Sequence, residues 1–457
     1  MRDYQVKTRH YKVNRGLFSQ VSQHMSDADK QKKALSVLFL QDMHADFPVR
    51  PELVSTSHGK IEQVLMAIPA AVSEGGDDSL WNVYRELFLK LPAYTRFIVV
   101  THPAIVGKLQ QWFTEHNLEP RVTLRMIPDY ITFTIWVQDP FIAVKDTATG
   151  KTFLIEPHSF PRWEDGYIAD FVAKQTDFIN LPAPLYFEGG NILIGDDFYL
   201  IGADYPVKSM SALNQVIMDG NTRKSPCDRV RELYSDYLDK SRKLLFVGST
   251  IPVPHQKKGP VTIGGEEWQE IFYTKNEKGT VQPMFHLDMF ITLAGRGENG
   301  AYRLLIGDPG LAAEILNEPV SAYAMPEVFD NIADKLNAQG FEVYRNPMPL
   351  IYVDDREKKR RKWYFASGNN GLMEIINGKE RRYWLPTYGY GNWKNLKATD
   401  EENMKIWESL NFRVTVLDDY HPLAEHTGAA HCIINYLQRG ENEFIYNTAQ
   451  KAGSDVP

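Results

Sequence analysis

Short apolar runs alternate along the chain with longer segments whose apolar residues recur every three or four positions. The runs end at Gly, Asp or Pro, which is typical of β-strands, and the segments between them have helical spacing. Strands are expected at 96–103, 132–144, 152–157, 191–202, 243–248, 289–295, 302–309, 381–389 and 412–419. Helices are expected at 79–91, 104–116, 226–244, 326–340 and 400–411.

Several strand pairs have the pattern of hairpins. Asp196 and Asp197 form a turn signal between the two apolar halves of 191–202, and the segment 295–300 (GRGENG) separates two further strands. Hairpins disfavour a plain doubly wound parallel sheet. The irregular recurrence of hairpin, helix and strand indicates a quasi-repetitive α/β architecture with one central site.

Domain organisation follows from where this pattern begins. Residues 1–30 are polar and aperiodic, so we expect an N-terminal arm. No clear linker interrupts the pattern afterwards, and residues 31–457 are predicted to form a single catalytic domain with insertions. The chain is long enough for two or three domains of about 150 residues, but a single large sheet or barrel often exceeds this length, so length alone does not fix the number of domains.

Composition narrows the class of protein. Hydrophobic residues make up 43% and charged residues 24%, which are ordinary globular values. The net charge of −7 argues against a nucleic-acid partner. The basic segment 356–362 lies between two strand-like runs and is interpreted as a solvated hairpin tip. No apolar run approaches the ~20 residues of a membrane helix.

The chain has only two cysteines, Cys227 and Cys432, and its first residues do not resemble a secretory signal. Two cysteines form neither a disulfide framework nor a cysteine-rich zinc site, so a reducing, cytoplasmic location is expected. Export by a route that reads no such signal would leave the same sequence pattern. No metal and no cofactor is expected.

Cys432 is the first candidate for chemistry. A single free cysteine is more often a small buried hydrophobe than a nucleophile. Here the small residues of 427–430 (TGAA) lead into the apolar run 433–437, a pattern typical of a backbone that passes close to a ligand. His431 precedes the cysteine, but adjacent side chains of a strand face opposite ways, so His431 is not the expected base.

Four further residues stand in apolar surroundings. His286 and Asp288 are two positions apart and would share one face of a strand, either as a structural pair or as a site. Glu188 precedes paired glycines, which is also the pattern of an ordinary bulge. Asp139 interrupts an apolar run and belongs at a strand end or in a pocket.

Together these residues are suited to a planar cation. Three carboxylates, one imidazole and one thiol describe a site in which a thiolate attacks a guanidinium group, because carboxylates bind guanidinium through paired N–H donors. The sequence therefore predicts a small-molecule or peptidyl guanidinium substrate.

These motifs, in this order, resemble the guanidine-modifying superfamily, most closely its agmatine deiminase and bacterial peptidylarginine deiminase branch. The segment 187–202 is similar to the family's Glu-Gly-Gly-Asn hairpin, 285–293 to its His-x-Asp strand, and 426–433 to its nucleophile segment. The segment 136–141 (WVQDPF) is similar to its Trp-x-Arg-Asp strand, and 367–389 to its Asn-bearing strand.

The resemblance implies an α/β pentein fold, a fivefold pseudo-symmetric propeller of ββαβ units. It implies that Cys432 is the nucleophile and His286 the general acid and base, with Glu188 beside it. Asp139 and Asp288 would bind the guanidinium group, and Asn370 would lie at the substrate site, although Asn369 offers an alternative register.

Two departures from the family pattern stand out. Gln138 replaces the arginine expected before Asp139, which removes a charge that would orient this carboxylate or meet a substrate carboxylate. Ala429 and Ala430 stand where glycines are common, so we expect a tighter approach to the substrate.

The resemblance predicts a deiminase that converts a guanidinium group to a ureido group and ammonia through a covalent cysteine thiouronium. The substrate would be agmatine, or arginine free or within a peptide, in which case the reaction is citrullination. One alternative is an amidinotransferase that resolves the same intermediate with an amine. Another is a non-catalytic guanidinium-binding protein of the same fold. A cysteine protease is disfavoured because an amide carbonyl does not call for a ring of carboxylates.

Overall fold

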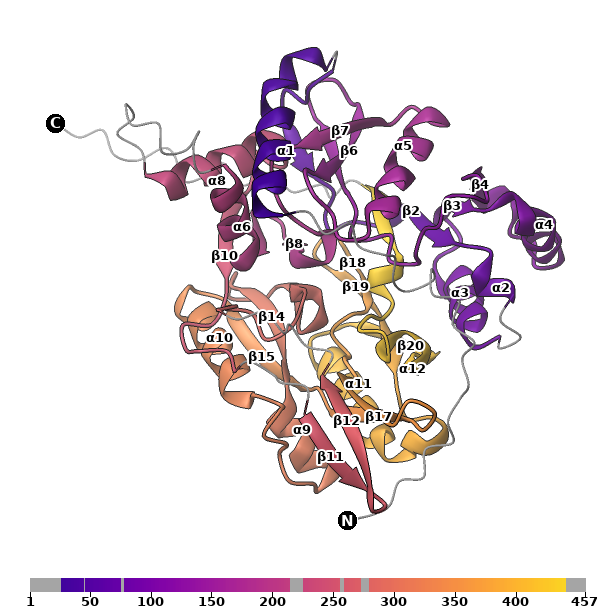
Figure 1. The fold of residues 1–457 in the computed structure, drawn as a ribbon, viewed down its shortest axis with the longest axis vertical. Helices are drawn as coiled ribbons and strands as arrows, with labels where there is room; N and C mark the ends of the chain where they lie inside the picture. The colour runs from indigo at the N-terminus through magenta and orange to yellow at the C-terminus, as the bar shows by residue number, and fades with distance from the viewer. Residues whose placement is uncertain are drawn as a thin grey trace.

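The computed structural model describes residues 26–44, 46–74, 78–213, 225–254, 259–272 and 279–440. Within them the chain forms a mixed α/β fold of small sheets and connecting helices (Figure 1). Most of the predicted N-terminal arm lies outside these residues. Helix α1 (Asp27–Phe39) begins inside it, where Ser26 forms a capping box with Asp29.

Five sheets in the described part of the chain share one pattern, an antiparallel strand pair followed, after one or more helices, by a parallel strand. The first contains β21 (Asn435–Arg439), β2 (Ile61–Ile68), β3 (Arg96–Thr101) and β4 (Val122–Met126), with α2 (Ala71–Glu74), α3 (Ser79–Lys90) and α4 (Val106–Glu115). The second contains β1 (Pro51–Leu53), β5 (Ile142–Asp146), β6 (Thr152–Pro157) and β7 (Ile179–Ala183), with α5 (Tyr167–Lys174).

The other three sheets repeat this order with three strands each. The third contains β8 (Ile192–Ile194), β9 (Phe198–Gly202) and β10 (Lys243–Val247), with α6 (Asp204–Ala212) and α8 (Pro226–Tyr237). The fourth contains β13 (Ile291–Arg296), β14 (Tyr302–Asp308) and β15 (Glu342–Pro347), with α9 (Pro309–Leu316) and α10 (Pro326–Ala338). The fifth contains β18 (Leu372–Ile376), β19 (Glu380–Thr387) and β20 (Arg413–Asp419), with α11 (Lys397–Ser409), and α12 (His421–Ala424) follows it.

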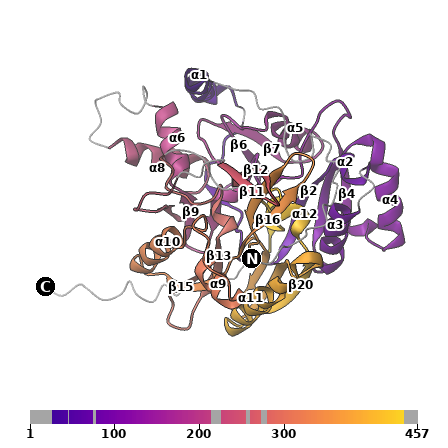
Figure 2. The same cartoon turned by 60° about the horizontal axis from the view of Figure 1, so that its bottom comes forward.

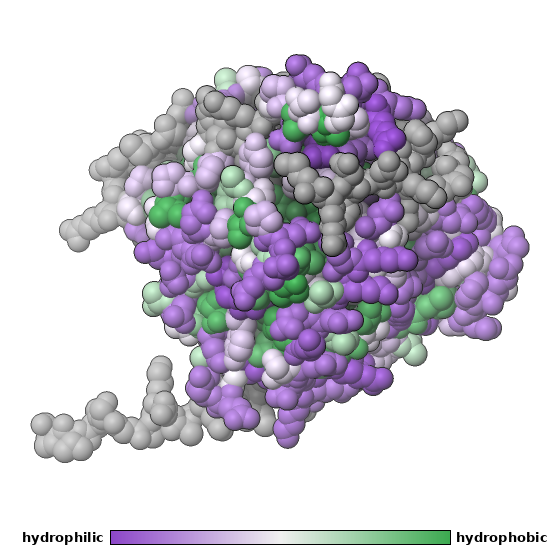
Figure 3. All heavy atoms as spheres, turned by 90° about the horizontal axis from the view of Figure 1, so that it is seen from below, coloured by the Kyte–Doolittle hydropathy of each residue, from purple (hydrophilic) through white to green (hydrophobic). Residues whose placement is uncertain are grey.

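A sixth sheet is inserted into this series. It joins the hairpin of β11 (Gly259–Ile263) and β12 (Glu266–Phe272) to the hairpin of β16 (Leu350–Asp355) and β17 (Arg360–Phe365). Of the predicted basic tip, residues 356–359 form the turn of the second hairpin, whereas residues 360–362 belong to β17. The inserted sheet lies at the lower end of the molecule in Figure 1 and comes forward in Figure 2. Polar residues cover most of this end, and the apolar areas in Figure 3 are small and separated.

Local sequence explains most of the regular elements. In α3 the apolar side chains of Leu80, Tyr84, Leu87 and Phe88 recur at helical spacing and are buried. The predicted hairpins at 191–202 and 289–308 are present as β8–β9 and β13–β14. Among the described residues no helix is long and apolar enough to cross a membrane.

The predicted strand 132–144 is wrong over most of its length. Only its last three residues belong to β5, and the preceding segment is irregular, with bends and one short turn at 137–138. The N–H and hydroxyl groups of Thr134 donate to the carboxylate of Asp165 at 2.7 and 2.6 Å, so this backbone has no strand partner here. Gln138 and Asp139, which lie in this irregular segment, are both buried.

Candidate active site

The strand β8 is preceded by Glu188, Gly189 and Gly190, and the two glycines allow close packing here. A Cβ on Gly189 would lie 1.9 Å from the carbonyl oxygen of Gln138, and one on Gly190 would lie 2.6 Å from Nδ1 of His286. Neither glycine has a positive φ. Their function is therefore close approach between segments, rather than the bulge that the sequence also allowed.

His286 and Asp288 lie at a 3₁₀ turn, not on a strand. The turn, Leu287–Met289, follows His286 and precedes β13, so the predicted i, i+2 strand geometry is wrong. The amide of Asn191 holds this turn, because its Oδ1 accepts from the N–H of Leu287 at 3.0 Å and from Nε2 of Gln282 at 2.8 Å. Asn191 and Gln282 are fully buried, and the sequence offered no signal for the contribution of Gln282.

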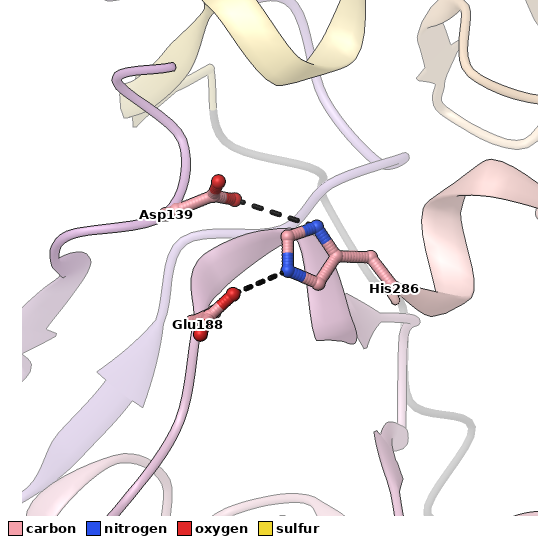
Figure 4. A group of neighbouring side chains, drawn as sticks. All are labelled: Asp139, Glu188 and His286. Atoms are coloured by element: carbon pink, nitrogen blue, oxygen red, sulfur yellow. Dashed lines mark hydrogen bonds and ion pairs between the residues drawn. The ribbon is translucent and has the colours of Figure 1, made fainter. Parts of the chain in front are cut away.

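The imidazole of His286 lies between two carboxylates, as Figure 4 shows. Its Nε2 is 2.6 Å from Oε2 of Glu188, and its Nδ1 is 3.5 Å from Oδ1 of Asp139. Burial alone would lower the pKa of His286, but the charge of Asp139 and the hydrogen bond and charge of Glu188 raise it to about 9. His286 is therefore a cation at neutral pH.

The two carboxylates differ in their acidity. Burial would raise the pKa of Glu188, but the hydrogen bond and charge of His286 lower it to about 2. Tyr186 also donates to this carboxylate, from Oη to Oε1 at 3.2 Å. Burial raises the pKa of Asp139 despite the nearby cations. Glu188 is thus the carboxylate that stays ionised and hydrogen-bonded to the imidazolium.

Cys432 lies in the 3₁₀ turn His431–Ile433 immediately before β21. Its Sγ is 3.4 Å from Oδ1 of Asn370 and 3.9 Å from Oδ2 of Asp288. Burial and the charge of Asp288 raise the pKa of the thiol well above its ordinary value. The thiol is therefore protonated at neutral pH in the free protein.

Two contacts position the segment that carries the cysteine. The Oδ1 of Asn370 accepts from the backbone N–H groups of Ala429 and His431, both at 3.1 Å. Gly428 packs on the indole of Trp136, where a Cβ would lie 2.3 Å from the ring. Ala429 is completely buried, as is Ala430. Asn370, not its neighbour Asn369, is the asparagine at the cysteine.

His431 belongs to this cluster, contrary to the sequence expectation. That expectation assumed a strand, whereas a 3₁₀ turn lets neighbouring side chains reach the same region. Nδ1 of His431 is 2.7 Å from Oδ2 of Asp288. This contact occupies one oxygen of Asp288 and fixes the orientation of the carboxylate.

Two carboxylate oxygens in the cluster have no hydrogen bond. Among the described residues, Oδ1 of Asp139 and Oδ1 of Asp288 are buried without a hydrogen-bond partner, and so is Nδ2 of Asn370. Buried polar atoms are normally paired, and an unpaired carboxylate oxygen is a strong acceptor for a charged N–H donor. The six predicted residues thus come together around two open acceptors.

A cation from a segment without any motif also reaches the cluster. Nη2 of Arg162 is 2.8 Å from Oδ2 of Asp139, and Nε of Arg162 is 2.8 Å from Oδ2 of Asp165. The sequence indicated only that a charge was missing at Gln138. It contained no signal that Arg162 supplies one.

Asp139, Glu188 and His286 have ligand atoms within 4.8 Å of one another, close enough for a metal ion. Both imidazole nitrogens, however, are directed at separate carboxylates. A metal would have to replace one of these contacts, so the arrangement is that of a hydrogen-bonded acid–base cluster rather than a ligand set.

No protein-family model and no curated sequence matches the chain. Solved structures do match. An agmatine deiminase of Enterococcus faecalis is 13% identical, with a TM-score of 0.52 over 87% of this chain and 99% of its own. A substrate-bound cysteine-to-serine variant of C. jejuni agmatine deiminase is 11% identical, with a TM-score of 0.51 over 87% and 100%.

A chain provisionally named a peptidyl-arginine deiminase is 12% identical, with a TM-score of 0.54 over 86% of this chain and 100% of its own. The fold is therefore the mixed α/β pentein fold of these structures. Among pentein proteins it is the fold of the agmatine deiminase and peptidylarginine deiminase branch.

Proposed function

We propose that this protein is a cysteine-dependent deiminase that hydrolyses the guanidinium group of agmatine, or of arginine free or within a peptide. The observation that carries the proposal is a pair of buried oxygens, Oδ1 of Asp139 and Oδ1 of Asp288, that have no hydrogen-bond partner within the described part of the chain and lie beside Cys432 and the imidazolium of His286. A guanidinium group has N–H donors in a plane and would satisfy both oxygens at once. Agmatine and arginine share this head group.

Binding of the substrate cation would also activate the nucleophile. The charges of Asp288 and Asp139 oppose ionisation of the Cys432 thiol. A guanidinium group between these carboxylates offsets their charge and lowers the cost of the thiolate. The thiol proton then leaves to solvent, and the thiolate is formed only next to its substrate.

The reaction proceeds in two steps. The thiolate of Cys432 attacks the guanidinium carbon, a C–S bond forms, and His286 donates a proton to the departing nitrogen as the C–N bond breaks and ammonia leaves. The neutral imidazole then takes a proton from water, and the hydroxide attacks the thiouronium carbon. The C–S bond breaks with Cys432 leaving as the thiolate, and the hydroxyl proton passes to solvent as the ureido product is released. Glu188 stabilises the imidazolium in the first step.

The propeller and the domain arrangement belong to the same proposal. The five strand–strand–helix–strand units support a fivefold pseudo-symmetric ββαβ propeller around the site. A single catalytic domain over 31–457, an N-terminal arm over 1–30 and a cytoplasmic location are further predictions. Both cysteines are free thiols, which fits a reducing compartment.

The test is a colorimetric ureido assay with agmatine, arginine, acetyl-arginine amide and an arginine-containing protein. Cys432→Ala should abolish product and still bind the guanidinium ligand, whereas Asp288→Asn should lower the affinity as well. Cys227→Ala, at the exposed cysteine, is the matched control and should remain active. Ureido product from the Cys432→Ala protein would refute the proposal.

The same assay separates the alternatives. Adding an amine acceptor distinguishes hydrolysis from amidine transfer, because a hydrolase continues to release ammonia and ureido product. A guanidinium-binding protein without activity would bind all four ligands normally and form no product.

A further inference from the structure

Arg162 reaches the candidate site from the loop between β6 and α5. Its Nη2 donates to Oδ2 of Asp139 at 2.8 Å, and its Nε donates to Oδ2 of Asp165 at 2.8 Å. The guanidinium carbon lies 4.8 Å from the centroid of the Phe160 ring. One arginine therefore joins a site carboxylate to a second, more deeply buried carboxylate.

Asp165 is a rigid anchor for this arginine. Its side chain is completely buried, and its oxygens accept from the N–H of Thr134 at 2.7 Å and from the hydroxyl of Thr134 at 2.6 Å. Thr134 lies in the same irregular segment that carries Asp139. The planar guanidinium group of Arg162 is thereby fixed at Nε by Asp165, and its Nη2 is held against Asp139.

This contact determines which oxygen of Asp139 remains available. Arg162 occupies Oδ2, while Oδ1 has no hydrogen bond among the described residues and faces Nδ1 of His286 at 3.5 Å. An arginine that took the place of the substrate guanidinium would bind Oδ1 of Asp139 and Oδ1 of Asp288. Arg162 instead binds Oδ2 of Asp139 and leaves Oδ1 available to the substrate.

The charges in the cluster support the same conclusion. The carboxylates of Asp139, Glu188, Asp288 and Asp165 outnumber the two cations of the cluster, His286 and Arg162, so the cluster carries excess negative charge. A guanidinium substrate offsets part of this excess. Without Arg162 the excess would be larger by one charge, and burial would favour protonation of Asp139.

We propose that Arg162 is the positioning residue of the guanidinium site, which holds Asp139 ionised and turned so that Oδ1 meets the substrate. It supplies the cation that Gln138 cannot supply. This inference rests on the proposed function, because it concerns how the Asp139 carboxylate is oriented and kept ionised to bind the guanidinium group of the substrate.

The test is the pH dependence of guanidinium binding in a Cys432→Ala background, which removes the thiol titration. The other groups around Asp139 are His286, Glu188 and Arg162, which act on it directly, and Tyr205, whose own pKa it raises. Agmatine affinity is measured by calorimetry between pH 4 and pH 8. Affinity should fall as the pH drops through the pKa of Asp139.

Arg162→Gln should move this fall in affinity to higher pH by about one to three units, because an adjacent arginine lowers the pKa of an aspartate by that amount. In the protein that retains its cysteine, the same change should lower kcat/KM on the order of 100-fold through misplacement of the carboxylate. Arg162→Lys keeps the charge but not the fork, so its binding midpoint should stay in place while kcat/KM falls about tenfold.

Arg242 provides a matched control. It also pairs with a completely buried aspartate three positions away, Asp239, at 2.6 Å in another part of the fold, although here the aspartate precedes the arginine. Arg242→Gln should lower the melting temperature as Arg162→Gln does, and leave the binding midpoint unchanged.

An Arg162→Gln protein with the wild-type midpoint and a kcat/KM within about threefold of wild type would overturn the inference while the proposed function stood. If Arg162→Gln does not fold, Arg162→Lys decides, and an unchanged kcat/KM overturns the inference. Should the Cys432→Ala protein bind no guanidinium ligand and the wild type form no ureido product, the proposed function fails and this inference fails with it.

Discussion

Glu188→Gln tests the charge state of the central imidazole. The pKa of His286 rises from 6.5 to about 9, and one pKa unit corresponds to about 1.4 kcal/mol, so its carboxylate neighbours favour the imidazolium by about 3 kcal/mol beyond the cost of burial. Glu188 contributes both a charge and the 2.6 Å hydrogen bond. Glutamine keeps the shape and removes the charge, and we expect the pKa of His286 to fall by about one unit, to near 8.

The sign of the effect on stability follows from the same values. Because the pKa of His286 is higher in the folded protein, the imidazolium stabilises the fold fully below pH 6.5, and this contribution is lost as the pH rises through about 9. Glu188→Gln should therefore reduce the melting temperature more at pH 6 than at pH 10.

The measurement is a titration of the protein labelled with [13C]histidine, followed by NMR between pH 5 and pH 10.5. The His286 signal is the one missing from a His286→Asn protein. The matched control is Glu374→Gln, at a completely buried carboxylate that accepts from the N–H of Ile61 at 2.6 Å outside the cluster. It should leave the titration near pH 9, and a Glu188→Gln protein that also titrates there would refute the reasoning.

Two other predictions concern packing and charge. Gly190→Ala should lower kcat/KM on the order of 100-fold, because the new methyl group would lie 2.6 Å from Nδ1 of His286; Gly107→Ala, where a Cβ has open space, should not change it. Chloroacetamidine should alkylate Cys432 on the order of tenfold faster or more than chloroacetamide does, because only the former carries the cation that the carboxylates attract. The exposed Cys227 is the internal control in mass spectrometry, and an equal preference for the cation at both cysteines would contradict the charge argument.

The sequence predicted the elements whose causes are local. Helix α3 follows from the spacing of its apolar residues, and the β8–β9 hairpin follows from the turn at Asp196 and Asp197. Those signals lie within a few positions of the structure they specify, so no tertiary contact is needed to interpret them.

The details of the candidate site depend on contacts between distant segments. The strand predicted around Asp139 is wrong because Asp165, which lies beyond β6, binds the backbone of Thr134. The strand geometry expected at His431 is wrong because a 3₁₀ turn forms there, and the expectation that His431 is not the base stays a prediction. Arg162 stands in a segment without a motif, and only the fold brings it to Asp139.

The pairing of β21 with β2 has a consequence for biosynthesis. The two strands are separated by more than 360 positions (Ile68 to Asn435), and Cys432 lies three positions before the first residue of the later one. Under the proposed function, all three carboxylates and the imidazole are translated before the nucleophile. Pairing at such long sequence separation slows folding, and a chain truncated before β21 would lack the strand that pairs with β2.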